Sequence, residues 1–267
     1  MATSAKEAKQ AAAQARAIAD AERKNRERKV RIAGAGIVAV VLAVLVAIPL
    51  AQSNSNKIKA SKVPTGVSTS TYGVKVGPGW TAANASKIPT LDIWEDFQCP
   101  VCGDFEKTTG ATIKKLAAEN KLRLQYRPAG FLDSNLSAQN SAAGNPESSL
   151  RATNAFGCAV DQGIGWDFHG LVFQNQPKTE GDGYNDSTFL SIARQLGLTG
   201  DKLSSFTDCV DNKTYKGWAN NSFVKFSAEG HSGTPTALLN GKELPLAVLS
   251  NPAKFTKAVA LEAASQK

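Results

Sequence analysis

The sequence predicts an α/β domain with a long helical insertion, preceded by a single transmembrane helix. Three observations support this prediction. Residues 32–51 carry no charge, short strand-like segments occur both early and late in residues 71–267, and the stretch between them has a helical pattern. With 267 residues, 42% of them apolar and 20% charged, the chain is long enough for one domain with a substantial core plus appendages.

The net charge of +8 is concentrated near the N-terminus. Residues 1–31 hold nine Lys or Arg and four Asp or Glu, a net of +5, which leaves +3 for the remaining residues. This segment is rich in good helix formers and predicts a basic, helical tail. The chain contains neither a Gly-rich phosphate loop nor the basic-aromatic pattern of a nucleic-acid-binding protein, so we exclude nucleic acid as a partner.

Residues 32–51 read "IAGAGIVAVVLAVLVAIPLA", twenty residues without a charge or a polar face. At about 1.5 Å per residue, a helix of this length spans about 30 Å, the thickness of a bilayer core. A cleaved signal peptide is the alternative, although its apolar region is usually shorter, about 7–15 residues. Six basic residues in Arg23–Arg31 precede the span. The positive-inside rule therefore predicts a single-pass protein of the cell membrane with a cytoplasmic N-terminus and an extracytoplasmic domain, where disulfides persist.

Residues 52–70 are polar, rich in Ser, Asn and Lys, and lack an apolar period. Such a segment behaves as a flexible linker, so we expect a tether between the membrane and the domain formed by residues 71–267. The domain opens with residues 71–76, "TYGVKV", which alternate like a short strand before a Gly-Pro-Gly break. A second strand, residues 90–97, runs directly into a pair of cysteines.

A helix and a third strand follow the cysteine pair. Residues 103–119 have helical periodicity, and the apolar side chains that this pattern predicts to be buried are Phe105, Ile113, Leu116 and Ala117. Residues 121–129, "KLRLQYRPA", read as the further strand.

The second half of the domain is mainly helical. Approximately residues 132–230 contain helical segments broken by loops rich in Gly, Pro and Asn, and we interpret this region as an insertion. Residues 236–244 contain two apolar runs about an Asn-Gly turn, the pattern of a β-hairpin. Asn251 and Pro252 then mark the start of a final amphipathic helix.

The chain has four cysteines: Cys99, Cys102, Cys158 and Cys209. An even number outside the membrane suggests two disulfides, for which three connectivities exist. The close spacing favours a local Cys99–Cys102 pair, which leaves Cys158 and Cys209 to pair with each other. Closing a loop of that size stabilises a fold by about 4 kcal/mol, so a structural role is favoured for the second pair. A second redox pair that relays electrons is the alternative.

Cys99 stands where a strand ends and a helix begins. Unpaired amide groups and the positive end of the helix dipole face a sulfur at this position, which favours the thiolate and lowers its pKa. Pro100 suits the first helical turn, because its missing N–H is not needed there. Cys102, one turn further in, is expected to be shielded and to act as the resolving thiol. Val101 adds no charge, so we expect an oxidant of intermediate strength.

Three segments carry a resemblance to a known family. "DFQCPVCGDFE", "FHGLVFQNQP" and "GTPTALLNG" resemble the DsbA-like thiol–disulfide oxidoreductases, which have a thioredoxin fold with a helical domain inserted before a cis-proline. The match covers about residues 71–266. The resemblance implies that Cys99 is the attacked and leaving sulfur, that Cys102 is its partner, and that the residues touching substrate are Pro100, Val101, Thr234 and Pro235, with Thr234-Pro235 in the cis form.

The membrane anchor and the second cysteine pair resemble the family members found in actinobacteria. This resemblance implies reduced exported proteins as substrates. It also implies reoxidation by a membrane protein, either a quinone-linked vitamin K epoxide reductase homologue or a DsbB-type oxidase. We expect a monomer that needs no cofactor.

One position departs from the family pattern. Thioredoxin-fold proteins often keep a buried acid six residues before the first cysteine, as a proton acceptor, and here that residue is Ile93. Asp92, Glu95 and Asp96 are nearby, and Glu95 is the possible proton acceptor if its side chain points inward. The alternative is that all three acids are exposed or cap the helix.

Other functions fit the sequence less well. A zinc site needs two more ligands, and neither His169 nor His231 forms a ligand pair with a neighbour in the sequence. His169 is expected to be a packed or surface side chain, and His231 either a loop residue or a contact of the active site. A Cys-His hydrolase is disfavoured, because a second cysteine would trap the nucleophile. A disulfide reductase or isomerase of the same fold and a non-catalytic, tethered peptide-binding module remain as alternatives.

Overall fold

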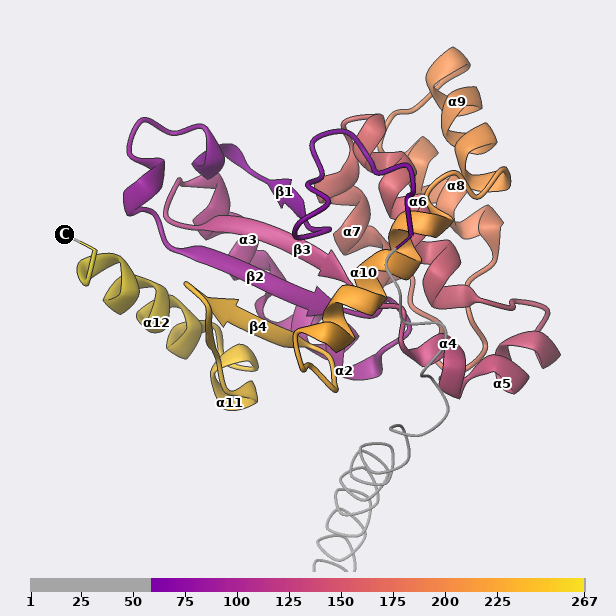
Figure 1. The fold of residues 1–267 in the computed structure, drawn as a ribbon. Coiled ribbons are helices and arrows are strands. Elements are labelled where there is room, and N and C mark those ends of the chain that lie inside the picture. Colours follow the sequence, from indigo (N-terminus) through magenta and orange to yellow (C-terminus); the bar gives the residue numbers. More distant parts are fainter. Residues whose placement is uncertain (1–58, 267) are drawn as a thin grey trace, which may run out of the picture. The chain divides into compact units, whose positions relative to one another are not determined.

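The computed structural model describes residues 59–266, so the predicted tail and membrane span in residues 1–51 lie outside the described part. Within that part, none of the helices combines the length and the apolar character needed to cross a bilayer. Five strands form one mixed sheet in the order β1-β3-β2-β4-β5 (Figure 1).

The centre of the sheet is β2 (Thr90–Glu95), which runs parallel to β3 (Arg123–Pro128) and antiparallel to β4 (Thr236–Leu239). The edges are β1 (Val74–Val76), antiparallel to β3, and the two-residue β5 (Lys242–Glu243). All the predicted strands are present, although β1, β2 and β3 are shorter than predicted. Two short turns of 3-10 helix, η1 (Pro78–Trp80) and η2 (Ala85–Lys87), join β1 to β2.

A parallel pair of strands needs a crossover, and a helix in three parts supplies it between β2 and β3. It consists of α2 (Pro100–Phe105), the π-helical turn η3 (Glu106–Gly110) and α3 (Ala111–Ala118). The sequence predicted one regular helix here. The four apolar side chains predicted to be buried are at most 7% exposed, so the prediction of the buried face is confirmed.

Seven helices lie between β3 and β4. They are α4 (Leu132–Asn135), α5 (Ser137–Ala142), α6 (Ser148–Asp161), α7 (Gly165–Gln174), α8 (Asp186–Gln195), α9 (Gly200–Asp211) and α10 (Lys216–Ala228). Helices α6 to α9 gather beyond one end of the sheet, and α10 returns alongside it (Figure 1). A disulfide between Cys158 and Cys209 joins α6 to α9.

The C-terminal part contains the predicted β-hairpin and the predicted final helix. Asn240 and Gly241 have φ angles of 48° and 79°, which the Asn-Gly turn between β4 and β5 requires. After α11 (Leu246–Leu249), the side chain of Asn251 accepts a hydrogen bond from the Lys254 amide at 3.0 Å and starts α12 (Pro252–Ala264).

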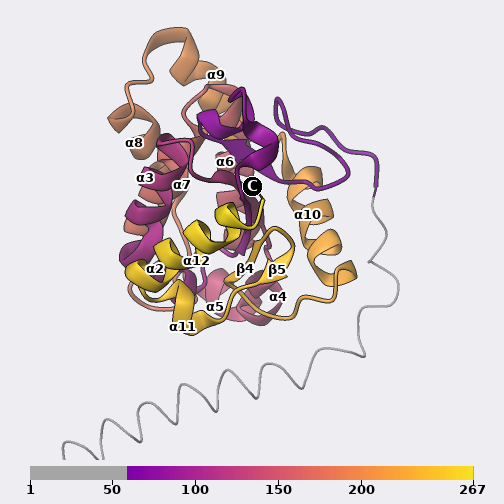
Figure 2. The ribbon, with the colours of Figure 1, turned by 90° about the vertical axis from the view of Figure 1, so that its left-hand side faces the viewer.

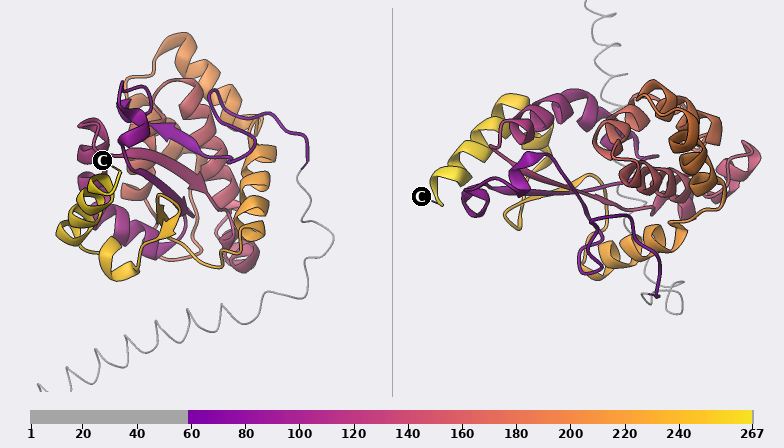
Figure 3. Two further views of the ribbon diagram at one scale, coloured as in Figure 1. Left: turned by 60° about the vertical axis from the view of Figure 1, so that its left-hand side comes forward. Right: turned by 90° about the horizontal axis from the view of Figure 1, so that it is seen from above.

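The sheet separates two helical layers. The crossover helix and α12 cover one face, and α10 covers the other (Figures 2 and 3). Because side chains alternate along a strand, Ile93 and Glu95 of β2 point to the same face, and Trp94 points to the other. Trp94 packs there against Phe226 of α10, with ring centroids 5.4 Å apart. Glu95 is thus directed to the face that carries the cysteine helix.

The predicted tether, residues 52–70, is not a free linker over its described part. The backbone N–H and C=O of Lys59 both bond to the side chain of Asn221 on α10, at 3.1 and 2.6 Å. The Thr65 amide donates to Asp161 at the end of α6 at 2.8 Å, and Val67 is buried. Composition alone could not predict these contacts, because the hydrogen bonds of this segment are made mainly by its backbone groups.

Candidate active site

Cys99 caps the N-terminus of α2 and lies against the segment that precedes β4. Its side chain is 6% exposed, and its Sγ donates to the backbone carbonyl of Thr234 at 3.4 Å. The Thr234-Pro235 peptide bond is cis. The strand–cysteine–helix junction and the late Thr-Pro turn, far apart in the sequence, therefore meet at one sulfur.

The surroundings of Cys99 stabilise its thiolate. The hydrogen bond from the Cys102 thiol lowers the pKa of Cys99 from 9.0 to about 7, against the opposing effect of burial. The Thr234 side chain and the backbone amides of Cys102 and Val101 lower this pKa further. These amides belong to the first turn of α2, where helical N–H groups have no partner within the helix.

Cys102 has the opposite character. Its side chain is fully buried, and burial raises the pKa of its thiol well above 9.0. The neighbouring Cys99 and the charge of Glu95 raise this pKa further. Breaking a Cys99–Cys102 bond therefore leaves the stable thiolate on Cys99, whereas Cys102 needs a proton.

The residues expected to contact substrate surround the sulfur of Cys99. Pro100 is exposed, while Val101, Thr234 and Pro235 are partly buried. They are thus more exposed than the sulfur of Cys99, which is itself almost covered.

Of the three acids near Cys99, Glu95 is the one placed to act on the cysteines. Its side chain is 4% exposed, and burial raises its pKa well above 4.5, with a further contribution from Cys99. Asp92 points to the other face of the sheet and accepts a hydrogen bond from Gln125 at 2.5 Å. The expectation that all three acids are exposed or capping is wrong, because Glu95 and Asp96 are buried and Cys99 itself occupies the N-cap of α2.

Asp96 instead fixes the loop before Cys99. It accepts hydrogen bonds from the Gln98 amide, the Ser149 hydroxyl and the Leu132 amide, at 2.9, 2.6 and 2.9 Å. Burial nevertheless raises its pKa to about 8. The side-chain amide of Gln98 extends this network to Asn140 at 3.2 Å. Buried polar bonds thus tie the loop that carries Cys99 to the helical insertion.

Two further side chains of the insertion bind the same loop. Gln176, just after α7, donates from Nε2 to the carbonyls of Phe97 and Cys99, both at 2.9 Å. The hydroxyl of Tyr184 also donates to the Phe97 carbonyl, at 2.8 Å. Gln176 belongs to the quoted segment "FHGLVFQNQP", but no periodicity in the sequence assigns it a bond to this loop.

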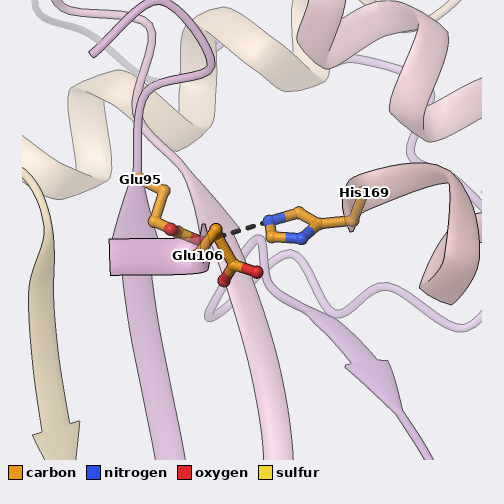
Figure 4. A group of neighbouring side chains, drawn as sticks. All are labelled: Glu95, Glu106 and His169. Carbon is orange, nitrogen blue, oxygen red and sulfur yellow. Dashed lines mark ion pairs between the residues drawn. The ribbon is translucent and has the colours of Figure 1, made fainter. Parts of the chain in front are cut away.

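His169 of α7 lies beside Glu95 and Glu106 (Figure 4). Its Nε2 is 3.0 Å from Oε2 of Glu95, and its side chain is 2% exposed. The sequence predicted a packed or surface histidine. It is packed, but it also meets two acids. The sequence did not predict that Glu106 points toward this group. Glu106 begins the π-helical turn η3, which departs from the 3.6-residue period used to assign helix faces.

Glu95, Glu106 and His169 are also the group in residues 59–266 that could hold a metal ion, since their donor atoms lie within 4.8 Å of one another. They supply three protein donors, one fewer than a structural zinc site uses. Neither cysteine belongs to the group. His231 lies on the other side of the sheet, next to Trp94 and Phe226, with ring centroids 5.9 and 5.5 Å away.

A cleft of about 970 Å³ opens between the cysteine helix and α7. Its lining includes Pro100, Gly103, Glu106 and Tyr126 on one side and Gly170 and Phe173 on the other. The cleft therefore extends from the exposed Pro100 at the start of α2 to Glu106.

Cys158 and Cys209 are bonded to each other, with an S–S distance of 2.04 Å. They stand near the C-terminal ends of α6 and α9, within the insertion. This pair is separate from the group formed by Cys99, Cys102 and Thr234.

The fold and the cysteine pair define a thioredoxin-like domain with a helical insertion. Residues 82–260 match a family described as thioredoxin, and the chain belongs to this family. No match was found among curated proteins.

Three solved structures share the fold. MdbA of Actinomyces oris, a thiol-disulfide oxidoreductase, has a TM-score of 0.62 and 22% identity, over 81% of this chain and 98% of MdbA. Oxidised DsbA of Mycobacterium tuberculosis has a TM-score of 0.52 and 25% identity, over 73% of this chain and 100% of DsbA. MdbA of Corynebacterium diphtheriae has a TM-score of 0.54 and 18% identity, over 79% and 100% of the two chains. The predicted thioredoxin-like fold is confirmed.

Proposed function

We propose that this chain is a thiol–disulfide oxidoreductase that donates the Cys99–Cys102 disulfide to exported proteins while they fold. The observation that carries the proposal is the difference between the two sulfurs. Cys99 is the one next to the surface and has a pKa of about 7, whereas Cys102 is buried with a raised pKa. A sulfur of low pKa is the better leaving group in thiol–disulfide exchange. The similarity to MdbA and DsbA supports the same activity.

The reaction follows from this difference. A substrate thiolate attacks Sγ of Cys99, the Cys99–Cys102 bond breaks, and the electron pair moves to Sγ of Cys102. Protonated Glu95 gives its proton to this sulfur. A second substrate thiolate then attacks the substrate sulfur of the mixed disulfide and displaces Cys99 as a thiolate. The substrate leaves with a disulfide and the protein is reduced. When a partner reoxidises the pair, Cys102 returns its proton to Glu95.

An extended substrate segment is held by Pro100, Val101, Thr234 and Pro235. Their partly exposed surfaces surround the sulfur of Cys99, and the Thr234 carbonyl is already within hydrogen-bond distance of that sulfur. These contacts position the substrate thiolate on the open side of Cys99, away from Cys102.

We also propose that residues 32–51 anchor the protein in the cell membrane, with the catalytic domain outside and residues 1–31 in the cytoplasm. The uncharged span and the six basic residues before it support this arrangement. The reoxidising partner is then a membrane protein, a quinone-linked vitamin K epoxide reductase homologue or a DsbB-type oxidase, and the chain acts as a monomer. Protease digestion of intact cells tests the orientation: residues 59–267 should be accessible from outside.

The reduction potential of the Cys99–Cys102 pair tests the activity. We expect a value well above about −270 mV, towards about −120 mV, when the purified full-length chain is equilibrated with glutathione buffers. A value between about −270 and −300 mV would indicate the alternative of a reductase. A value below about −300 mV would indicate a structural disulfide in a peptide-binding module.

A further inference from the structure

Three side chains near the cysteine pair have buried polar atoms that no described residue satisfies by an aligned hydrogen bond. They are Glu95 with both carboxylate oxygens, Glu106 with Oε1 and His169 with Nδ1. Most buried polar atoms in proteins have a partner, so a cluster of unpaired atoms requires an explanation. Burial of Glu95 and His169 is almost complete, at 4% and 2% exposure.

The fold holds these side chains together from three separate elements. Glu95 ends β2, Glu106 begins the π-helical turn η3, and His169 lies in α7. Gly110, at the end of η3, leaves the space that the Glu106 carboxylate occupies, because a Cβ atom at Gly110 would collide with Oε2 of Glu106. The cluster thus depends on the irregular turn of the crossover helix.

Stacking fixes the imidazole of His169. Its ring lies 3.6 Å from the ring of Tyr126, centroid to centroid, at an interplanar angle of 18°. Phe97, Phe156 and Phe173 surround it at centroid distances between 5.1 and 5.6 Å. The ring is therefore held by apolar contacts, and both its nitrogens stay available for proton exchange.

The burial that holds the cluster also keeps it uncharged. Burial raises the pKa of Glu95 well above 4.5 and the pKa of Glu106 to about 8, and it lowers the pKa of His169 to about 4. Near neutral pH, two carboxylic acids and a neutral imidazole lie side by side. Such a set can release and accept protons without creating a lasting buried charge.

Few other ionisable groups face the cluster. Tyr126 faces it from β3, with a raised pKa, and Cys99 and Cys102 face it from α2. The charge of Lys114 on α3 also acts on Glu106 and His169, and this lysine forms an exposed ion pair with Asp167 on α7. None of these groups from the described elements lies between Glu95 and His169.

The cluster connects an enclosed space with an open one. Glu95 and His169 line a cavity of about 10 Å³, which is room for about one water molecule. Glu106 is only partly buried and lines the cleft of about 970 Å³ between α2 and α7. Glu95, whose charge acts on Cys102, is the end of the cluster toward the cysteines, and Glu106 is the end nearest solvent.

We propose that Glu95, His169 and Glu106 form a proton route that connects Cys102 with the cleft. This inference rests on the proposed function. After Glu95 has protonated the Cys102 thiolate, His169 gives a proton from Nε2 to the Glu95 carboxylate and takes one at Nδ1 from Glu106. Glu106 regains its proton from water in the cleft. During reoxidation the proton of Cys102 leaves by the reverse steps, so that each cycle moves one proton in and one proton out.

Two variants test the route in the full-length chain. His169→Phe keeps an aromatic ring in the stacked position, and Glu106→Gln keeps the shape of the side chain, but neither new side chain can release and take up a proton near neutral pH. With a reduced dithiol peptide as substrate, we expect kcat to fall at least tenfold at pH 7 while KM stays unchanged. The solvent deuterium isotope effect on kcat should increase. His231→Phe makes the same chemical change at the chain's other histidine and should leave the pH profile and the isotope effect at wild-type values.

Chemical rescue separates proton transfer from packing. His169→Ala should lose activity and regain at least part of it with added imidazole. Pyrazole, a ring of similar size but a far weaker base, should not restore activity. If both rings restore activity equally, His169 supports the packing only and the proposal fails.

Two further results would overturn the route. One is a wild-type pH profile and isotope effect in both His169→Phe and Glu106→Gln. The other is one equivalent of a divalent metal in the purified protein that is lost in these variants, since the cluster would then be a metal site. If the wild-type chain does not oxidise the peptide at all, the proposed function itself is wrong. If the wild-type chain oxidises the peptide and both variants do so equally well, the proposed function stands and the proton route is refuted.

Discussion

The two cysteine pairs of this domain stand at opposite ends of their helices. Cys99 occupies the N-cap of α2, where free amide groups and the positive end of the helix dipole face the sulfur. Cys158 and Cys209 lie in the last turns of α6 and α9, where the dipole disfavours a negative charge. A thiolate is thus stabilised at Cys99, and the helix dipole disfavours one at Cys158 and Cys209. Position on the helix, more than the presence of a disulfide, distinguishes reactive sulfur from structural sulfur here.

The largest effect is expected from removing the sulfur at the helix start. Cys99→Ser should reduce the oxidation of a dithiol peptide to the uncatalysed rate, because no other sulfur of low pKa lies near Thr234. The double variant Cys158→Ser/Cys209→Ser should keep the rate within about twofold of wild type. Peptide oxidation followed by fluorescence compares the two directly. Loss of activity in the double variant, at a temperature where it is folded, would show that the second pair relays electrons.

The same double variant should differ from wild type in stability. Cys158 and Cys209 are 51 residues apart, and removal of a cross-link over a loop of this size should lower the free energy of unfolding by about 4 kcal/mol. Denaturant unfolding of wild type and variant measures the difference. A decrease of less than about 1 kcal/mol would mean that α6 and α9 are held by packing alone.

A smaller effect concerns the pH dependence of the first pair, measured in the Cys158→Ser/Cys209→Ser background so that only Cys99 and Cys102 can be reduced. The pKa of Cys99 is lowered from 9.0 to about 7 in the folded protein. A lowered pKa stabilises the folded state above the pKa of the unfolded state, and this stability is lost as the pH falls through the folded value.

Relative to the oxidised form, the reduced form should therefore gain about 2 kcal/mol of folding free energy between pH 7 and pH 9. Above pH 9 the raised pKa of Cys102 opposes a further gain. Urea unfolding of both forms at several pH values measures the gain, and thiolate absorbance at 240 nm locates the pKa. A constant difference between the two forms would contradict the lowered pKa.

Local patterns in the sequence were sufficient for most of the fold. The strand before Cys99, the Asn-Gly hairpin and the capped final helix each depend on neighbouring residues, and all three are present. The partners of the active-site loop could not be predicted in this way. Glu106 is directed inward by a π-helical turn that interrupts the regular period, and His169 meets Glu95 only because α7 packs against the cysteine helix. The hydrogen bonds of residues 59–70 could not be predicted from composition, because they are made mainly by backbone groups, which every residue has.

The attachment of Lys59 to α10 has a consequence for the proposed membrane anchor, because it shortens the connection between the anchor and the domain. If residues 32–51 cross the bilayer, seven residues, 52–58, separate this span from Lys59, which is bonded to α10. Even fully extended, these residues reach about 25 Å. With the proposed membrane anchor, this short connection would keep the domain next to the lipid surface. Its substrates would then be segments that have only just left the membrane, and its reoxidising partner would be embedded within reach of the same anchor.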